Sequence, residues 1–241
     1  AGLRAAPPGS PGLVLFEGLA LTVRPGESTA ICGPSGCGKS SLLRVLAGLW
    51  PPAAGSVRVP AARGRGGLLF LPQRPYVTLG SLWEQVAYPA APGGDGDRLR
   101  AEQLLGDVGL GHLLEAWGLE AAVDWRSVLG PGDMQKLAFA RLLYHRPSFA
   151  LMDEATSALD LHAEARLMGL CEARGITAIS VCHRPSAIGL HRRVLRYTAS
   201  SVGAGRDPSS WRLQDSPAED RGAAAALAKE APAPAAAKEA A

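Results

Sequence analysis

One stretch of the chain has the residue types and spacing that bind the phosphates of a nucleotide. It follows the pattern G-x-x-x-x-G-K-[ST], after an apolar run over residues 28–32 and before a helical pattern over residues 40–50. Glycines let the backbone curl so that its N–H groups face phosphate oxygens, Lys39 supplies a cation, and Ser40 supplies a hydroxyl ligand for Mg²⁺. The sequence therefore predicts a nucleoside triphosphate site made of Gly33, Pro34, Ser35, Gly36, Cys37, Gly38, Lys39, Ser40 and the adjacent Ser41.

Polar residues follow three further apolar runs and could complete a hydrolytic site. Hydrolysis of a triphosphate needs a held Mg²⁺ and an oriented water, because positioning and charge stabilise its transition state. Asp153 is predicted to hold Mg²⁺, directly or through water, and the adjacent Glu154 to polarise the attacking water. Gln73 is predicted to offer its amide to Mg²⁺ or water, and His183 to donate to the γ-phosphate.

The elements that must position these residues alternate between strand and helix. Predicted strands over residues 67–71, 149–152 and 176–181 end in polar residues, and predicted helices cover residues 135–145 and 159–173. Such alternation describes an α/β fold with a mostly parallel sheet that binds its ligand at the carboxyl ends of the strands. Short helices over residues 81–88, 98–108 and 112–117 predict a helical insertion.

Composition sets limits on the class of protein. The 241 residues are 47% hydrophobic with a net charge of +3, which suits a globular domain and gives no reason to expect a nucleic acid partner. An Arg-Gly segment at residues 63–67 lies between two predicted strands, which favours a hairpin loop over an RNA contact. No run is long and apolar enough to cross a membrane and no signal peptide is recognisable, so we expect a soluble chain. Because it starts with Ala1, we also expect it to be part of something longer.

The four cysteines show neither C-x-x-C spacing nor a pairing with histidines, so neither a zinc site nor a disulfide framework is predicted. A reducing compartment is the better expectation. Cys37 would lie near a helix N-terminus, where it is either a reactive thiol or a passive small residue.

Six motifs in this order resemble those of an ABC ATPase. The resemblance covers residues 13–197, and its motifs are Walker A (33–40), the Q-loop glutamine Gln73, the signature (129–135), Walker B (149–154), the D-loop (157–160) and the switch histidine His183. It implies a phosphate-loop NTPase core of the RecA-like kind, with an antiparallel β subdomain and an inserted helical subdomain. Within the superfamily, residues 70–76, 80–89 and 139–147 resemble subfamily D half-transporters and their bacterial relatives. Residues 124–129 are most similar to the lysosomal cobalamin branch, with the peroxisomal acyl-CoA branch nearly as close.

The resemblance implies a partner and a location. Two such domains sandwich two ATP molecules with Mg²⁺, so that Gly130, Gly132 and Asp133 of one signature meet the γ-phosphate held by the other subunit, and Asp160 lies at the seam. The second domain belongs to the same or a different half-transporter, and a transmembrane domain is the other implied partner. The location implied is the cytosolic face of a peroxisomal or lysosomal membrane, with ATP hydrolysis coupled to transport.

Two departures from the family pattern stand out. Gly130 occupies the position where the family usually has serine, so a hydroxyl that contacts the γ-phosphate is missing and we expect weakened hydrolysis at that site. No aromatic residue occurs in residues 1–12 to stack on adenine. A degenerate, ATP-binding half of a heterodimer therefore remains an alternative. A soluble non-transport ABC ATPase and a phosphate-loop kinase are further alternatives that fit the motifs less well.

The sequence also suggests domain limits. Residues 1–12 are predicted as a linker, residues 13–74 and 140–213 as the ATP-binding core, and residues 75–139 as the helical subdomain with the signature loop. Residues 211–213 resemble the closing strand of the core. Residues 214–241 are rich in Ala, Lys, Glu and Pro and are predicted to be a disordered tail.

Overall fold

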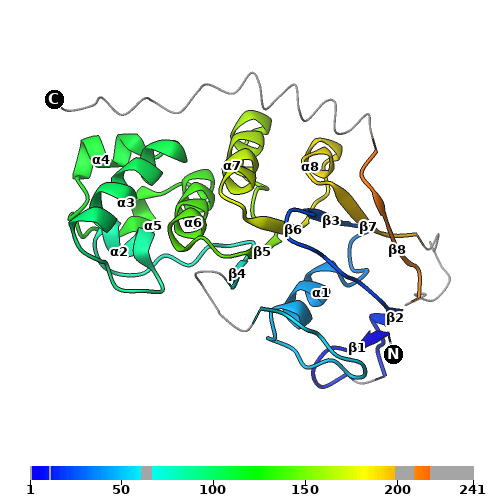
Figure 1. Ribbon diagram of the computed structural model, residues 1–241. Helices are drawn as coiled ribbons and strands as arrows, with labels where there is room; N and C mark the ends of the chain where they lie inside the picture. The colour runs from blue at the N-terminus through cyan, green and yellow to red at the C-terminus, as the bar shows by residue number, and fades with distance from the viewer. Residues whose placement is uncertain (1, 11, 61–66, 199–208, 218–241) are drawn as a thin grey trace.

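A six-stranded sheet forms the centre of the molecule (Figure 1). The structure is a computed structural model and describes residues 2–10, 12–60, 67–198 and 209–217. Five strands run parallel, and the last strand pairs antiparallel at the edge, so the predicted α/β fold with a mostly parallel sheet is confirmed. In sheet order the strands are β4 (Leu68–Leu71), β5 (Phe149–Asp153), β6 (Thr177–Val181), β3 (Thr29–Cys32), β7 (Arg193–Tyr197) and β8 (Trp211–Asp215).

Helices cover both faces of this sheet. In Figure 1, α1 lies on one face, and α7 and α8 lie on the other. Alternate residues of β5 explain how the strand serves both layers: Leu151 packs in the cluster that contains α1, whereas Ala150 and Met152 pack in the cluster that contains α7. The helices are α1 (Lys39–Leu46), α2 (Leu82–Ala87), α3 (Asp95–Asp107), α4 (Gly111–Trp117), α5 (Trp125–Val128), α6 (Pro131–His145), α7 (Leu161–Ala173) and α8 (Pro185–Gly189).

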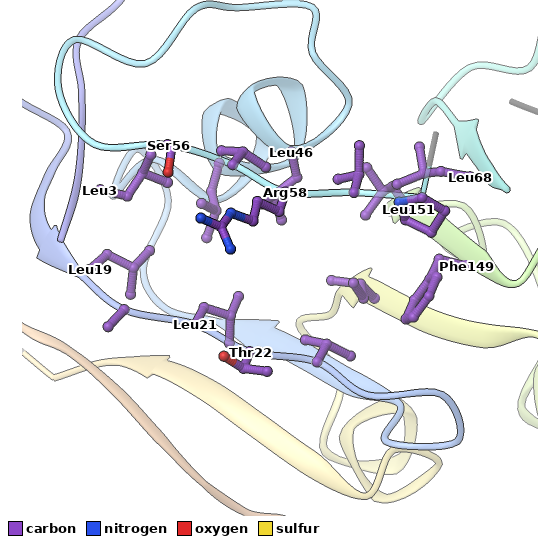
Figure 2. A pocket seen from close by; sticks show the side chains of 17 residues that line it. Leu3, Leu19, Leu21, Thr22, Leu46, Ser56, Arg58, Leu68, Phe149 and Leu151 are labelled. Atoms are coloured by element: carbon purple, nitrogen blue, oxygen red, sulfur yellow. The ribbon is translucent and has the colours of Figure 1, made fainter. Parts of the chain in front are cut away.

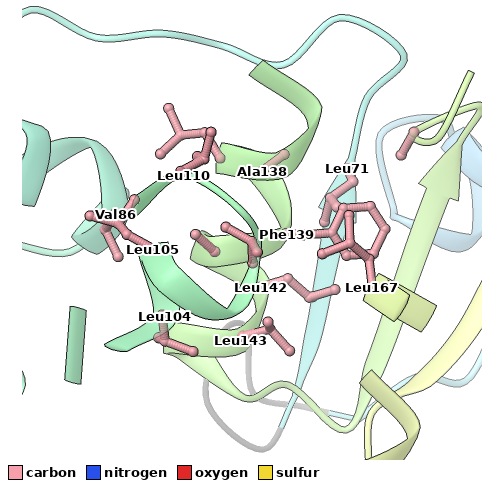
Figure 3. Packing of buried hydrophobic residues seen from close by; sticks show 14 of the residues in the cluster. Leu71, Val86, Leu104, Leu105, Leu110, Ala138, Phe139, Leu142, Leu143 and Leu167 are labelled. Atoms are coloured by element: carbon pink, nitrogen blue, oxygen red, sulfur yellow. The ribbon is translucent and has the colours of Figure 1, made fainter. Parts of the chain in front are cut away.

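The helices α2 to α5 gather beside the sheet and are joined to it through α6 (Figure 1). Figure 3 shows Phe139 and Leu142 of α6 between Leu105 of α3 on one side and Leu71 and Leu167 on the other. One hydrophobic cluster therefore runs from the sheet into the helical part. The predicted limit between residues 139 and 140 falls inside α6, because both halves of this continuous helix pack in the same cluster.

A small antiparallel sheet of β1 (Leu3–Ala5) and β2 (Phe16–Leu19) lies next to the core. The prediction that residues 1–12 are only a linker is therefore wrong. Leu3 and Ala5 are buried, and in register they face Leu19 and Phe16. A strand of three residues is too short for alternation to reveal it in the sequence, and nearby prolines and glycines suggest a loop.

The last strand among the described residues is β8, at the edge of the main sheet. β8 runs to Asp215 and so continues past residue 213, and the ring of Trp211 packs edge-on against Tyr197 with centroids 5.3 Å apart. The predicted tail over residues 214–241 thus overlaps the strand, because Trp211 and Leu213 anchor it on β7. Residues 218–241 and residues 63–66 of the Arg-Gly segment lie outside the described residues. Among the described residues no helix is long and apolar enough to cross a bilayer.

Candidate functional site

The predicted phosphate loop connects the end of β3 to the start of α1. Gly36 and Gly38 have φ values of 78° and 107°, in the region that favours glycine, so the loop curls as the pattern requires. Gly33 must be glycine for a different reason, lack of space, because a Cβ there would lie 2.8 Å from the Cβ of Tyr197. The Lys39 ammonium is buried beneath the loop and donates to the carbonyl oxygens of Gly33 at 3.0 Å and Pro34 at 2.9 Å. A cation is thus held where the loop would receive phosphate oxygens.

Cys37 lies within this loop, and its side chain is buried. A reactive thiol is usually at least partly exposed. The structure therefore favours the passive role over the reactive one.

A hydroxyl and a carboxylate lie together at the N-terminal end of α1. The Ser40 hydroxyl donates to a carboxylate oxygen of Asp153, the last residue of β5, at 2.8 Å. Burial raises the pKa of Asp153, and the hydrogen bond from Ser40 acts in the opposite direction. Oxygen ligands of this kind are the ones that Mg²⁺ prefers, so this pair fits a magnesium ion beside bound phosphates.

Glu154 joins two other predicted catalytic residues. Its Oε2 accepts from the Nε2 of Gln73 at 2.8 Å, and its Oε1 lies 2.9 Å from the Nε2 of His183. The strands that precede these residues, β4, β5 and β6, are neighbours in the sheet, so their carboxyl ends meet at one edge. Glu154 has a φ of 50°, a conformation that costs a residue other than glycine roughly 1 to 2 kcal/mol. Backbone strain of this kind is concentrated at functional sites.

The predicted signature residues form a second, separate group at the N-terminus of α6. Gly130 is the N-cap residue, and Gly132 and Asp133 lie in the first turn. The Asp133 carboxylate pairs with Lys136 at 3.0 Å. Gly132 lies against the D-loop, where an added Cβ would approach the carbonyl oxygen of Ala158 to 3.3 Å. This group presents helix N–H groups, which suit an anion.

Two polar residues at the D-loop received no role from the sequence. Gln135 is buried on α6, where it accepts from the backbone N–H of Ala158 at 2.9 Å and donates to the Ser157 hydroxyl at 3.1 Å. Arg184 follows the switch histidine and donates to the carbonyl oxygens of Leu159 in the same loop and of Thr156 just before it. The available signal for Gln135 was a polar residue on the otherwise apolar face of the signature helix.

A cavity lies apart from the site residues described above. It has a volume of about 290 Å³ and lies between the β1–β2 sheet and the core (Figure 2). Aliphatic and aromatic side chains such as Leu19, Leu46, Leu151 and Phe149 make most of its wall, and Arg58 points into it. The residues with the chemistry predicted for phosphate binding lie elsewhere, at the carboxyl ends of the strands.

Comparison with known proteins agrees with this geometry. The family profile described as ABC transporter matches residues 16–157, which include the phosphate loop, the signature and the Asp153–Glu154 pair. The chain belongs to the ABC transporter family. It is an ATP-binding domain of the ABC type, as the fold, the motifs and the family match together require.

Several curated relatives are members of subfamily D. ATP-binding cassette sub-family D member 3 of Mus musculus is 44% identical over 180 residues, covering 73% of this chain and 27% of the relative. The lysosomal cobalamin transporter ABCD4 of Mus musculus is 47% identical over 189 residues, covering 76% and 31%. An ABC transporter ATP-binding protein of Synechocystis is 45% identical over 195 residues, covering 80% and 29%. The chain thus spans less than a third of the length of these relatives.

A solved structure has the same fold. It is the structure of a bacterial Atm1-family ABC exporter with ATP bound, which superposes with a TM-score of 0.67 at 25% identity and covers 80% of this chain and 36% of that one. The predicted ABC ATPase fold is therefore confirmed, and with it the expectation that the domain binds ATP.

Proposed function

We propose that this chain is the ATP-hydrolysing motor domain of a half-transporter similar to subfamily D, and that it couples ATP-driven dimerisation to substrate movement across an organelle membrane. The observation that carries the proposal is the contact of Glu154 with both Gln73 and His183. A carboxylate held in this way can orient and polarise a water, and the two partners can respond to the γ-phosphate.

Magnesium completes the proposed chemistry. We assign Ser40 and Asp153 as its protein ligands, with Gln73 as a further ligand from the next strand. When bound, the ion would neutralise charge that develops on the transferred phosphoryl group. Lys39 would exchange its carbonyl partners for phosphate oxygens as the nucleotide binds.

A second copy or a related domain would complete each site. The signature residues Gly130, Gly132 and Asp133 form their own group at the start of a helix of 15 residues. We propose that this N-terminus meets the γ-phosphate held by the partner domain, so that ATP brings the two domains together.

The membrane domain of the transporter would dock on a groove between the sheet and the helical part. The groove has a volume of about 620 Å³, and Leu71, Pro75, Tyr76, Tyr88 and Pro89 are among the residues that line it. Tyr76, which lines the groove, is 56% exposed, and Leu79, three residues later in the chain, is 91% exposed. The occupant we propose is a helical segment of the membrane domain, because the curated relatives are more than three times as long as the part they share with this chain. One of them is named a lysosomal transporter, which supports an organelle membrane of the lysosomal or peroxisomal kind.

The test is ATP hydrolysis by the purified 241-residue chain and by a Glu154→Gln variant over a range of protein concentrations. Turnover that depends on Glu154 and rises more than linearly with concentration supports a dimerising motor domain. The isosteric amide removes the base while it keeps a group that can contact Gln73 and His183.

One observation favours a second candidate function. The signature lacks a hydroxyl at Gly130, so the chain would instead be the degenerate, ATP-binding half of a heterodimeric transporter. Nucleotide binding without turnover at any concentration would support this reading and would contradict the leading one. A soluble ABC ATPase outside transport is a weaker alternative, since it leaves the apolar groove without an occupant.

A further inference from the structure

A buried carboxylate lies one helical turn after the end of the D-loop. Glu164 of α7 is only 2% exposed, and a buried charge of this kind is costly unless it is paired and hydrogen-bonded. It receives both kinds of partner. Arg184 donates to its Oε2 at 2.8 Å, and the Thr156 hydroxyl donates to its Oε1 at 2.5 Å. Burial raises the pKa of Glu164, and these two partners oppose that change.

The same arginine also binds the backbone of the loop. Its Nη1 donates to the carbonyl oxygen of Leu159 and its Nη2 to that of Thr156, both at 3.0 Å. One guanidinium therefore spans the segment that leads into the D-loop and most of the loop itself. A planar fork with fixed donors suits this task, and the single charge of a lysine does not.

The arginine also adjoins the proposed catalytic residues. Arg184 directly follows His183, and a cavity of about 230 Å³ has Glu154, His183, Arg184 and Glu164 in its wall. Leu159 immediately precedes Asp160, whose carboxylate caps α7 by accepting from the N–H of Ala163 at 2.8 Å. The guanidinium is thus the short connection between the switch histidine and the residue expected at the dimer seam.

We propose that Arg184 is a positioning residue that ties the D-loop to His183, and that Glu164 holds its guanidinium in place. This proposal rests on the proposed function, because it assigns the arginine a task in hydrolysis by that site. Arg184 acts through its neighbours, since its three hydrogen bonds go to Glu164 and to two carbonyl oxygens. Without Arg184 the D-loop loses its hydrogen bonds to the segment that carries His183, and the distance between His183 and Asp160 is no longer fixed.

The experiment compares the 241-residue chain with Arg184→Gln, Arg184→Lys and Glu164→Gln variants. The matched control is Arg192→Gln, which removes another arginine that pairs with α7, because Arg192 and Glu172 form an ion pair in which both side chains are well exposed. Two readouts are needed. One is kcat and KM for ATP, and the other is hydrogen exchange of the D-loop amides Ser157 and Leu159, which donate to carbonyls within this turn.

We expect Arg184→Gln to lower kcat by about 10- to 100-fold, the usual effect of a small misplacement near a reacting centre, while KM stays within about threefold. The amides of Ser157 and Leu159 should exchange faster, whereas Arg192→Gln should change neither quantity. Glu164→Gln should give a smaller effect in the same direction. A variant that carries both Arg184→Gln and Glu164→Gln should lose no more activity than Arg184→Gln alone, since both residues act through one contact.

Unchanged exchange of the D-loop amides in Arg184→Gln would overturn the proposal, and so would an unchanged kcat in a turning-over enzyme. If Arg184→Gln does not fold, Arg184→Lys decides, because lysine keeps the charge beside Glu164 but cannot span both carbonyl oxygens. If the unmodified chain shows no turnover, the proposed function fails. The exchange experiment still decides whether Arg184 holds the D-loop.

Discussion

Restoring a hydroxyl at the N-cap of the signature helix should raise ATP turnover. Gly130 has φ −69° and ψ 167°, which any residue adopts, and a Cβ built there meets nothing within 4 Å. Gly130→Ser therefore introduces the side chain without strain. As an N-cap, serine would also accept from a free N–H of the first turn, so we expect the variant to be more stable by a few tenths of a kcal/mol.

The magnitude follows from the kind of bond that the hydroxyl would make. A hydrogen bond to a charged group contributes about 1.5 to 3 kcal/mol. If it acts on the γ-phosphate in the transition state, turnover should rise by about 10- to 100-fold. The effect on catalysis is thus far larger than the effect on stability, and this difference separates a contact with ATP from a better helix cap.

The assay is phosphate release by Gly130→Ser and by the unchanged chain, at protein concentrations where turnover per molecule has reached its plateau. Gly130→Ala is the matched control, because it fills the same space and removes the same flexibility without a hydroxyl. The reasoning fails if serine leaves turnover unchanged. It also fails if alanine raises turnover as much as serine does.

Three further predictions concern single side chains. Burial lowers the pKa of His191 from 6.5 to about 4, so between these pH values the unfolded chain binds more protons than the folded chain. The free energy of unfolding should therefore fall by roughly 3 kcal/mol as the pH drops through that window. In urea unfolding, His191→Gln should show a weaker dependence of this free energy on pH. Arg141 donates to the backbone oxygen of Gln85 at 2.5 Å and to its side-chain oxygen at 3.2 Å. Arg141→Met should therefore lower the free energy of unfolding in urea by about 2 to 4 kcal/mol, and a loss below about 1 kcal/mol would contradict this. Ser40→Ala should reduce the gain in ATP affinity caused by Mg²⁺ by about tenfold or more. Calorimetry should show unchanged ATP binding without the metal. An equal loss of ATP affinity with and without Mg²⁺ would argue against Ser40 as a ligand.

The main features of the fold could be predicted from the sequence because they are carried by strong local patterns. The buried strand β5 and the helix α7 have long apolar runs or clear helical spacing, and both lie within about two residues of their predicted limits. The strand β1 could not be predicted, since only its pairing with β2 makes its three residues a strand. The helix α5 has four residues, and the buried Trp125 that fixes it donates to the distant carbonyl oxygen of Gly80. Such elements depend on tertiary contacts more than on propensity.

Part of the candidate site could also be predicted, namely the residues of the glycine-rich phosphate loop and the polar residues that directly follow a strand. Parallel strands bring their carboxyl ends to one edge, so the meeting of Gln73, Glu154 and His183 follows from the order of the motifs together with the topology. The roles of Gln135 and Arg184 could not be predicted, because most of their partners are backbone groups in and just before the D-loop. A sequence pattern does not reveal which carbonyl oxygen a side chain will reach.

The D-loop connects the two groups of site residues within one chain. Gln135 binds it from the signature helix, and Arg184 binds it from the segment after His183. Gln135 also donates to the backbone oxygen of Glu154 at 3.5 Å, and His183 contacts the carboxylate of the same residue, which we propose as the base. A movement of α6 relative to the sheet must therefore carry the D-loop with it or break these bonds. The position of the signature and the geometry around Glu154 are consequently interdependent, which is the coupling that the motor we propose would require.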